Sequence, residues 1–489
     1  FNAPGGAWDA TENGTWTILL REGEVQDNQE LYSAPRALGT FTVNISDPNV
    51  IFVDTTLDTI DTDPNDSQPA DSQGRVSLRA AIMHANTIDA PTVVVIPAGT
   101  YTLSRPGREG EDVAVPPNPA IGDLDLTSPR GITLLGAGAF STIIDAQQLD
   151  GVFDVPETAT ASLRGLTVRN GNASAGGGIR NAGTLSLDSV LVTDNQAQRA
   201  GGGVFSTGNL TIIDSSLENN QTISRFFGVG GGGLAVIGDP VGESGLTTIT
   251  NTSVVGNMSS DSGGGLLASD AQMSLKKVTV AGNTAQRGSG GGLFVRQATG
   301  SKTTLLDQVT LTTNLALSGN GGGLFINTPN DQLTLRNTVI AENQARLSPD
   351  VSGRFVSDGT SLVSQLRLNQ RQLESNAADL DQIGSSQSPL DPGLGPLDRA
   401  SGVVQTRSVI AGGLVSNSGV AGRADFSLTP ELTITYSTAE LEPNNSRGQA
   451  MRLDDRGWSL EENADIANST TIPHVTITGT GDGTFDFYS

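Results

Sequence analysis

The chain has 489 residues, of which 61 are glycine and none is cysteine, so disulfides and thiol chemistry are excluded. Its 52 acidic residues outnumber the 28 basic ones, and the resulting net charge of −24 argues against nucleic acids or anionic membranes as partners. No apolar run reaches the roughly 18 residues that a transmembrane helix needs.

Residues 1–46 carry the signals of a β-hairpin. Asn13 and Gly14 stand between Trp8 and Trp16, and Asn-Gly is favoured in two-residue hairpin turns. We interpret the segment as the end of a β-sandwich. The stretch APGGAWDATENGTWTILLREGEVQDN resembles the closing part of immunoglobulin-like modules of large bacterial surface proteins.

Residues 47–130 combine an acidic loop with a short helix. Ser77 can cap a helix whose apolar residues Leu78, Ile82 and Ala85 share one face. The order VDTTLDTIDTDPNDSQPADSQGRVSLRAAIMHAN, VVVIPAGTYTL and ITLLGAG resembles the CSLREA-type module at the head of bacterial extracellular β-helix proteins. The resemblance implies an N-terminal cap whose helix covers the open first coil. Where that family usually has two cysteines, this chain has Pro69 and Val76.

Two acidic clusters in this region are candidate metal sites. Crowded carboxylates suit Ca²⁺, so the first candidate ligands are Asp61, Asp63, Asp66 and Asp71. Their spacing does not match the EF-hand, and a solvated acidic loop is the alternative. The second cluster is interpreted as structural, with metal binding as its alternative: Glu111, Asp112, Asp123 and Asp125.

Residues 131–350 contain six copies of one repeat unit. Each copy opens on a glycine triplet followed by an aliphatic residue, and successive copies are 25 to 32 residues apart. Apolar residues alternate with polar ones ahead of a closing asparagine, which is the period of a β-strand. We therefore predict a right-handed parallel β-helix with caps at both ends, flanked by partial β-sandwich segments. β-Propeller blades are longer, and leucine-rich repeats carry a different pattern.

Stacked coils place equivalent residues in ladders about 4.8 Å apart. The closing asparagines are expected to form one such ladder: Asn195, Asn220, Asn257, Asn283, Asn314 and Asn343. If the aliphatic residue after each triplet points inward, its successor points outward. This gives an apolar contact surface: Phe205, Leu267, Phe294 and Phe325. A one-residue error would reverse the two faces, or segment 361–428 could fold over this surface.

Beyond the repeats we expect a C-terminal cap over 351–428. Residues 429–489 are interpreted as a linker and the start of a β-sandwich, which is similar to the opening of pre-peptidase C-terminal-type domains. Both ends of the chain are expected to be cut from a longer polypeptide.

The search for catalytic residues concentrates on the strand before each asparagine. A glycosidase needs two nearby carboxylates, but the columns seven and six positions before the asparagine contain none in adjacent coils. His84 and His474 are interpreted as structural. The sequence therefore predicts a non-enzymatic structural spacer, adhesin or assembly component at the cell surface or outside the cell.

The expected partners of such a segment are neighbouring domains of its own polypeptide, other copies of itself or a surface polysaccharide. Calcium is the one cofactor considered. The alternative function is a polysaccharide-binding or polysaccharide-cleaving module, which a row of aromatic side chains beside paired carboxylates would favour.

Overall fold

The structure is a computed structural model that describes residues 14–20, 36–43, 49–66, 68–107, 118–223, 230–240, 245–298, 302–329, 332–357, 361–366, 381–399, 402–410, 414, 437–439 and 476–478. The chain divides into two compact units, Phe1–Asp391 with Arg399–Gln405 and Pro392–Asp398 with Thr406–Ser489. Each unit is described by itself. No helix among the described residues is long and apolar enough to cross a bilayer.

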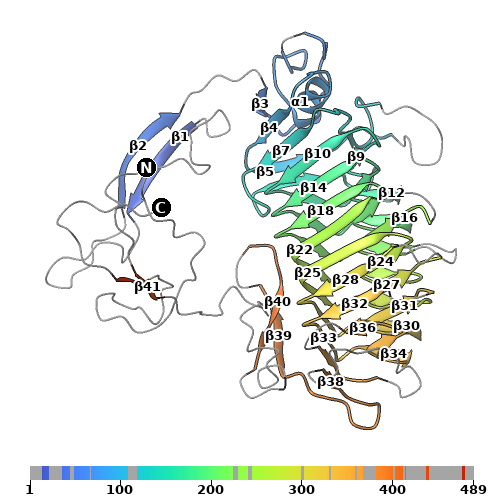
Figure 1. The fold of residues 1–489 in the computed structure, drawn as a ribbon. Coiled ribbons are helices and arrows are strands. Elements are labelled where there is room, and N and C mark those ends of the chain that lie inside the picture. Colours follow the sequence, from blue (N-terminus) through green and yellow to red (C-terminus); the bar gives the residue numbers. More distant parts are fainter. Residues whose placement is uncertain are drawn as a thin grey trace. The chain divides into compact units, whose positions relative to one another are not determined.

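The first unit contains a parallel β-helix, so the predicted fold class is confirmed (Figure 1). A sheet of nine strands consists of β6 (Leu124–Asp125), β9 (Phe153–Val155), β13 (Ile179–Asn181), β17 (Val204–Ser206), β21 (Leu234–Ile237), β24 (Leu266–Ser269), β27 (Leu293–Arg296), β31 (Leu324–Asn327) and β35 (Val351–Ser352). A sheet of seven strands consists of β12 (Asn172–Ala175), β16 (Gln196–Ala200), β20 (Gln221–Thr222), β23 (Met258–Ser259), β26 (Thr284–Ala285), β30 (Leu315–Asn320) and β34 (Gln344–Leu347).

The third sheet has 20 strands in two parallel rows. Its strands are β3 (Val50–Phe52), β4 (Thr92–Ile96), β5 (Gly99–Thr102), β7 (Ile132–Gly136), β8 (Thr142–Asp145), β10 (Thr160–Arg164), β11 (Thr167–Arg169), β14 (Thr184–Asp188), β15 (Leu191–Thr193), β18 (Asn209–Ile213), β19 (Ser216–Glu218), β22 (Leu246–Val255), β25 (Gln272–Ala281), β28 (Thr304–Asp307), β29 (Thr310–Thr312), β32 (Leu333–Arg336), β33 (Val339–Ala341), β36 (Val356–Ser357), β37 (Leu362–Val363) and β38 (Gln382–Ile383). The sheet thus extends on both sides of the predicted coil region 131–350.

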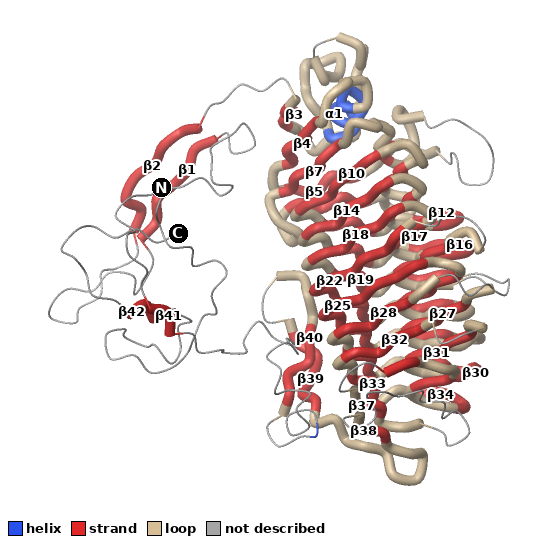
Figure 2. The backbone as a smooth tube through the Cα atoms, in the orientation of Figure 1, coloured by secondary structure: helices blue, strands red, loops and turns tan. Residues whose placement is uncertain are grey.

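The remaining elements are short. One helix, α1 (Leu78–Ala85), is drawn in blue in Figure 2. Antiparallel pairs are formed by β1 (Gly14–Leu20) with β2 (Arg36–Val43) and by β39 (Leu394–Asp398) with β40 (Thr406–Val409), while β41 (Ser437–Ala439) pairs in parallel with β42 (Thr476–Thr478). Gly14 is the first residue of β1 and pairs with Val43, so it does not lie in the turn of this strand pair as the Asn13-Gly14 signal predicted. The immunoglobulin-like and pre-peptidase resemblances stay predictions.

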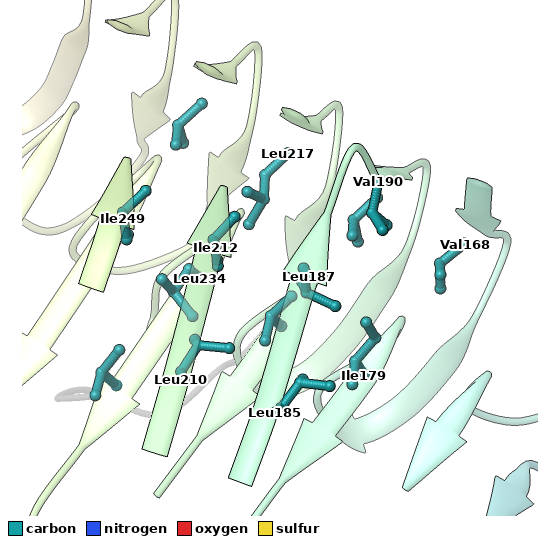
Figure 3. Packing of buried hydrophobic residues seen from close by; sticks show 14 of the residues in the cluster. Val168, Ile179, Leu185, Leu187, Val190, Leu210, Ile212, Leu217, Leu234 and Ile249 are labelled. Carbon is teal, nitrogen blue, oxygen red and sulfur yellow. The ribbon is translucent and has the colours of Figure 1, made fainter. Parts of the chain in front are cut away.

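The core lies inside the coils and is built from aliphatic ladders. Leu187, Ile212 and Ile249 stand in register on successive strands and are fully buried. Figure 3 shows these side chains pointing between the sheets, toward residues such as Ile179 and Leu234 on the opposite side. Alternating residues therefore reach the interior on every strand, as the two-residue period predicts.

The glycine triplets make the turn into the nine-stranded sheet. Gly201 has a positive φ of 62°, and a Cβ there would lie 2.2 Å from the carbonyl oxygen of Val204. At Gly202 a Cβ would lie 2.4 Å from the carbonyl oxygen of Gly232 on the next coil. Only glycine permits both the backbone conformation and the stacking distance at this corner.

The N-terminal helix is tied to the loop that precedes β6. Ser77 is the N-cap, and its Oγ accepts a hydrogen bond from Ala80 N, as predicted. The buried Arg79 pairs with Asp58 at 2.6 Å and donates hydrogen bonds to the carbonyl oxygens of Gly122 and Asp123. Arg79 thereby fixes the backbone that leads into the first strand of the nine-stranded sheet.

Arg399, Val403 and Gln405 lie against the outer face of the 20-stranded sheet. Arg399 forms an ion pair with Glu218, and Gln405 N donates to Ser253 Oγ at 3.0 Å. Val403 packs with Ala139 and Leu191. This described part of the predicted C-terminal cap covers strands β15, β19 and β22, and not the face that carries the predicted apolar surface.

Candidate functional site

The outer face of the nine-stranded sheet carries one continuous column of side chains. In register from β6 to β31 these are Asp125, Asp154, Arg180, Phe205, Ala235, Leu267, Phe294 and Phe325. Their neighbours in the chain, such as Ile179 and Val204, are fully buried in the core. Alternation along a strand therefore turns the column away from the core.

Two carboxylates meet at the N-terminal end of this column. Asp125 and Asp154 are direct register partners on neighbouring parallel strands, so their Cα atoms are about 4.8 Å apart. Both residues are nearly enclosed, with exposed fractions of 3% and 7%. A carboxylate removed from water in this way costs free energy unless it gains a partner or a proton.

Arg180 supplies that partner for Asp154. Its Nη1 lies 3.0 Å from each of the two carboxylate oxygens of Asp154. Burial raises the pKa of Asp154 above its usual value, although the charge and hydrogen bonds of Arg180 act in the opposite direction. The side chain of Arg180 is one-third exposed, so it forms the accessible edge of the cluster.

Apolar side chains follow in the same column. Leu267 is buried, whereas Phe205, Phe294 and Phe325 are half-buried. The rings of Phe294 and Phe325 stack with their centroids 5.1 Å apart and an interplanar angle of 5°. Stacked rings cover each other's faces, and the predicted contact surface is therefore an apolar strip that is only partly open.

The six repeat asparagines form a continuous buried ladder. Each Nδ2 donates to the Oδ1 of the asparagine on the next coil at 2.9 or 3.0 Å, and also to a main-chain carbonyl oxygen. Asn343 ends the series by donating to Asp350 Oδ1 at 2.9 Å. Each inner amide uses both donors and both acceptor positions, so the ladder has no group left for a ligand.

The acidic loop of the cap uses its carboxylates locally. The Oδ1 atoms of its aspartates accept main-chain hydrogen bonds two residues on, at Asp61–Asp63, Asp63–Asn65, Asp66–Gln68 and Asp71–Gln73. These are Asx turns, which explain the close spacing of the aspartates. Asp71 also pairs with Arg75 at 2.7 Å, which lowers its pKa. This pair helps to hold the loop in place.

A buried pair lies beside that loop. Asp61 Oδ2 and His84 Nδ1 are 3.8 Å apart, and burial raises the pKa of Asp61. Within the part of the chain that the structure describes, no three His, Cys, Asp or Glu side chains are grouped so that they could hold a metal ion. The calcium site at Asp61, Asp63, Asp66 and Asp71 stays a prediction. Glu111, Asp112 and His474 lie outside the described residues.

The sequence places Asp125 in the second acidic cluster, but its pairing with Asp154 was not predicted. The columns seven and six positions before each asparagine belong to the 20-stranded sheet, and the first of them lies in the coil of the first glycine triplet. Asp154 lies one coil earlier, in Phe153–Val155, where no triplet marks the turn. Extending the outward column backward from Arg180, by matching apolar-polar-apolar tripeptides, finds Phe153-Asp154-Val155 and then Leu124-Asp125-Leu126.

Comparison with known proteins finds matches among solved structures. No protein-family model and no curated protein matches it. Similar solved structures include a rhamnogalacturonan lyase with 14% identity and a TM-score of 0.42, covering 76% of this chain and 98% of that one. A pectate lyase has 12% identity and a TM-score of 0.34, with coverage of 68% and 81%.

A third similar structure is the A-module of an Azotobacter vinelandii mannuronan C-5 epimerase, with 14% identity, a TM-score of 0.32 and coverage of 66% and 94%. The other matching structures are named as α-1,3-glucanase and alginate lyase. All of these names are those of enzymes that act on polysaccharides, so the prediction of a non-enzymatic spacer or adhesin is wrong by this comparison. At such low identities and TM-scores the likeness concerns fold, and an assignment of activity has to rest on this chain's own residues.

Proposed function

We propose that this chain is a polysaccharide-cleaving module whose substrate binds along the outer face of the nine-stranded sheet. The observation that carries the proposal is the register pair Asp125 and Asp154, held beside Arg180 at one end of an apolar column. Paired carboxylates beside a row of aromatic side chains distinguish a polysaccharide-active face from the surface of a spacer.

Asp154 has the properties that bond cleavage requires. Breaking a glycosidic link needs a group that gives or takes a proton at the reacting atoms. A carboxyl whose pKa is raised by burial keeps its proton closer to neutral pH than an exposed one does. Arg180 orients this carboxyl through its two contacts, and Asp125 supplies the second carboxylate on the neighbouring strand.

The apolar part of the column supports binding of the rest of the polymer. Sugar rings have apolar C–H faces, and half-buried phenylalanines offer matching apolar area. Phe205 lies one strand beyond Arg180, and Phe294 and Phe325 lie further along the same face. Successive positions are about 4.8 Å apart, so a polymer of several sugar units can contact the column along its length.

The test is cleavage of a panel of polysaccharides, measured as new chain ends, by the whole chain and by Asp154→Asn. Removing a general acid or base typically lowers the rate by about 100-fold or more. Asp188→Asn is the matched control, because Asp188 pairs with Arg164 at 3.1 Å on the outer face of the 20-stranded sheet. We expect it to retain full activity.

Three results would count against the proposal. Undiminished cleavage by Asp154→Asn would exclude Asp154 as a catalytic residue. Equal losses of activity in Asp154→Asn and Asp188→Asn would indicate a general loss of structure. Binding without cleavage by the unsubstituted chain would reduce the module to a carbohydrate-binding one. A chain that neither binds nor cleaves any polysaccharide would reject the function.

We further propose that the module acts outside the cell. A polysaccharide is too large to enter a cell, so an enzyme that cleaves it has to act outside. The resemblance to extracellular β-helix proteins supports the same location. The division into residues 1–46, 47–130, 131–350, 351–428 and 429–489 stays part of this proposal.

A further inference from the structure

The strand that carries Asp125 lies at the end of its sheet. Among the described strands of the nine-stranded sheet, β6 is the last, and it is only two residues long. On the side of β9, Leu124 N and Leu126 N donate to the main-chain oxygens of Val152 and Asp154 at 2.9 and 2.8 Å. Consecutive residues of a strand direct their main-chain groups to opposite sides, so those of Asp125 face away from β9. These groups need partners from outside the sheet.

The side chain of Asn86 bonds to this second side of β6. Its Nδ2 donates to Asp125 O at 2.8 Å, and its Oδ1 accepts from Thr127 N at 2.8 Å. A residue of a parallel neighbouring strand makes the same two bonds, to the oxygen of one residue and to the N–H of the residue two positions further on. The Asn86 amide therefore takes the place of a peptide group from a neighbouring strand, opposite Leu126.

Arg79 holds the chain just before Asp125. Its guanidinium donates to Asp123 O at 3.0 Å and to Gly122 O at 2.8 Å. The pairing with Asp58 at 2.6 Å fixes the guanidinium in its buried position. A guanidinium presents its N–H donors in fixed directions, so it can hold several carbonyl oxygens in one arrangement.

Both side chains project from the same packed helix. α1 begins after the N-cap Ser77, and Asn86 is its C-cap. Every residue of α1 is buried, and Leu78, Ile82 and Ala85 belong to the main core cluster. Figure 1 shows the helix at the end of the stack of coils. Functional groups are placed most accurately when the residues that support them stand on packed elements.

We infer that Asn86 and Arg79 are positioning residues, through which α1 keeps the Asp125 carboxylate opposite Asp154. The inference rests on the proposed function, because it assigns both residues to the reaction at that carboxylate pair. Both act on the main chain around Asp125, at the oxygens of Asp123 and Asp125 and at the N–H of Thr127. The helix then does more than cover apolar residues, because it completes the site.

Loss of these contacts should slow the chemical step and leave substrate binding almost unchanged. A displacement of about 1 Å near the reacting groups can cost on the order of 100-fold in rate. The apolar column that we propose to bind the polymer continues through Phe205 and Phe294 on later strands, which α1 does not hold through these bonds. A positioning role therefore predicts a lower kcat at an almost constant KM.

The test uses Asn86→Ala in the whole chain, with Ser77→Ala as the matched control. Each substitution removes a side chain at one end of α1 that makes two hydrogen bonds. Those of Ser77, to Thr59 O at 2.6 Å and from Ala80 N at 3.0 Å, do not involve β6. Melting curves of both variants report how far each one loosens the helix, and the kinetic measurements are made well below both melting temperatures.

The probes are soluble glucan, xylan, polygalacturonate and alginate, and kinetics are measured on the polymer that the unsubstituted chain cleaves fastest. We expect kcat to fall about 10- to 100-fold in Asn86→Ala while KM changes by less than about twofold. In Ser77→Ala both constants should stay within about twofold of those of the unsubstituted chain.

A second variant tests Arg79. Arg79→Lys keeps a positive charge beside Asp58 but presents fewer donors to the carbonyl oxygens, so it should lower kcat in the same way. If Arg79→Lys does not fold, the result for Asn86→Ala decides the inference by itself.

An unchanged kcat in Asn86→Ala would overturn the inference and leave the proposed function standing. Equal losses of kcat in Asn86→Ala and Ser77→Ala would do the same, because they would indicate a general loosening of the helix. An unsubstituted chain that cleaves none of the four polymers would instead reject the proposed function, and the inference with it.

Discussion

Removing one amide from the middle of the asparagine ladder is expected to destabilise the β-helix strongly. The side chain of Asn283 donates to Asn314 Oδ1 at 2.9 Å and to Val254 O at 2.8 Å. Its Oδ1 accepts hydrogen bonds from the main-chain N and the Nδ2 of Asn257, at 2.9 and 3.0 Å. All of these atoms belong to fully buried residues.

The size of the effect follows from the groups left behind. In Asn283→Ala the N–H of Asn257 and one of its Nδ2 hydrogens lose their acceptor, and water cannot replace it in the interior. An unsatisfied buried group costs about 1 to 3 kcal/mol, so two orphaned donors predict a loss of roughly 2 to 6 kcal/mol. Gln196→Ala is the control, because this amide bonds to Gln221 at 2.8 Å on the outer face, and exposed substitutions usually change stability by less than about 0.5 kcal/mol.

Two measurements check this prediction. Urea denaturation of both variants gives the change in unfolding free energy, and hydrogen exchange reports locally on the amide of Asn257, which should exchange faster in Asn283→Ala. Equal stability of the two variants, together with unchanged exchange at Asn257, would refute the reasoning from buried donors.

Three further predictions address the core, the end of the ladder and the cap. Leu275→Asp places an unpaired charge in the interior and should lower the free energy of unfolding by several kcal/mol in denaturation experiments. Ser274→Asp, on the outer face of the same strand, should be tolerated. Similar losses of stability in both variants would contradict the inward position of Leu275. Burial raises the pKa of Asp350 from 3.8 to about 6, so the folded state binds the proton more tightly than the unfolded chain does. The free energy of unfolding should therefore fall by about 3 kcal/mol as pH rises from 4 to above 6. Asp350→Asn should flatten this pH dependence, and an unchanged pH dependence in the variant would exclude Asp350 as its source. The calcium hypothesis predicts a higher melting temperature with Ca²⁺ than with a chelator. The Asp63→Asn and Asp66→Asn double variant should melt at the same temperature in both conditions. Coincident melting curves for the unsubstituted chain would exclude a calcium site in this loop.

The β-helix could be read from the sequence because its determinants are local and repeated. The alternation that puts Leu187, Ile212 and Ile249 inside is visible within each strand, and their register follows from the repeat spacing. The N-cap at Ser77 is likewise a local signal, since it depends on a hydroxyl and an amide three residues apart. Strand period and capping chemistry involve only neighbouring residues.

The candidate site depended on contacts that the sequence does not display. Asp125 and Asp154 are separated by a whole coil that lacks the glycine triplet, and they become neighbours only when β6 and β9 stack. The columns before each asparagine belong to the 20-stranded sheet. Their lack of paired carboxylates therefore carries no information about the outer face of the nine-stranded sheet.

Burial was also decided by tertiary structure alone. Alternation predicts an exposed column, yet Leu267 is buried and Phe294 stacks on Phe325. Asp154 obtains its raised pKa from enclosure, and the charge that opposes it comes from Arg180 on the next coil. Alternation determines which side of a strand a residue occupies, whereas exposure and pKa depend on the residues that stacking brings beside it, and these lie a full coil away in the chain.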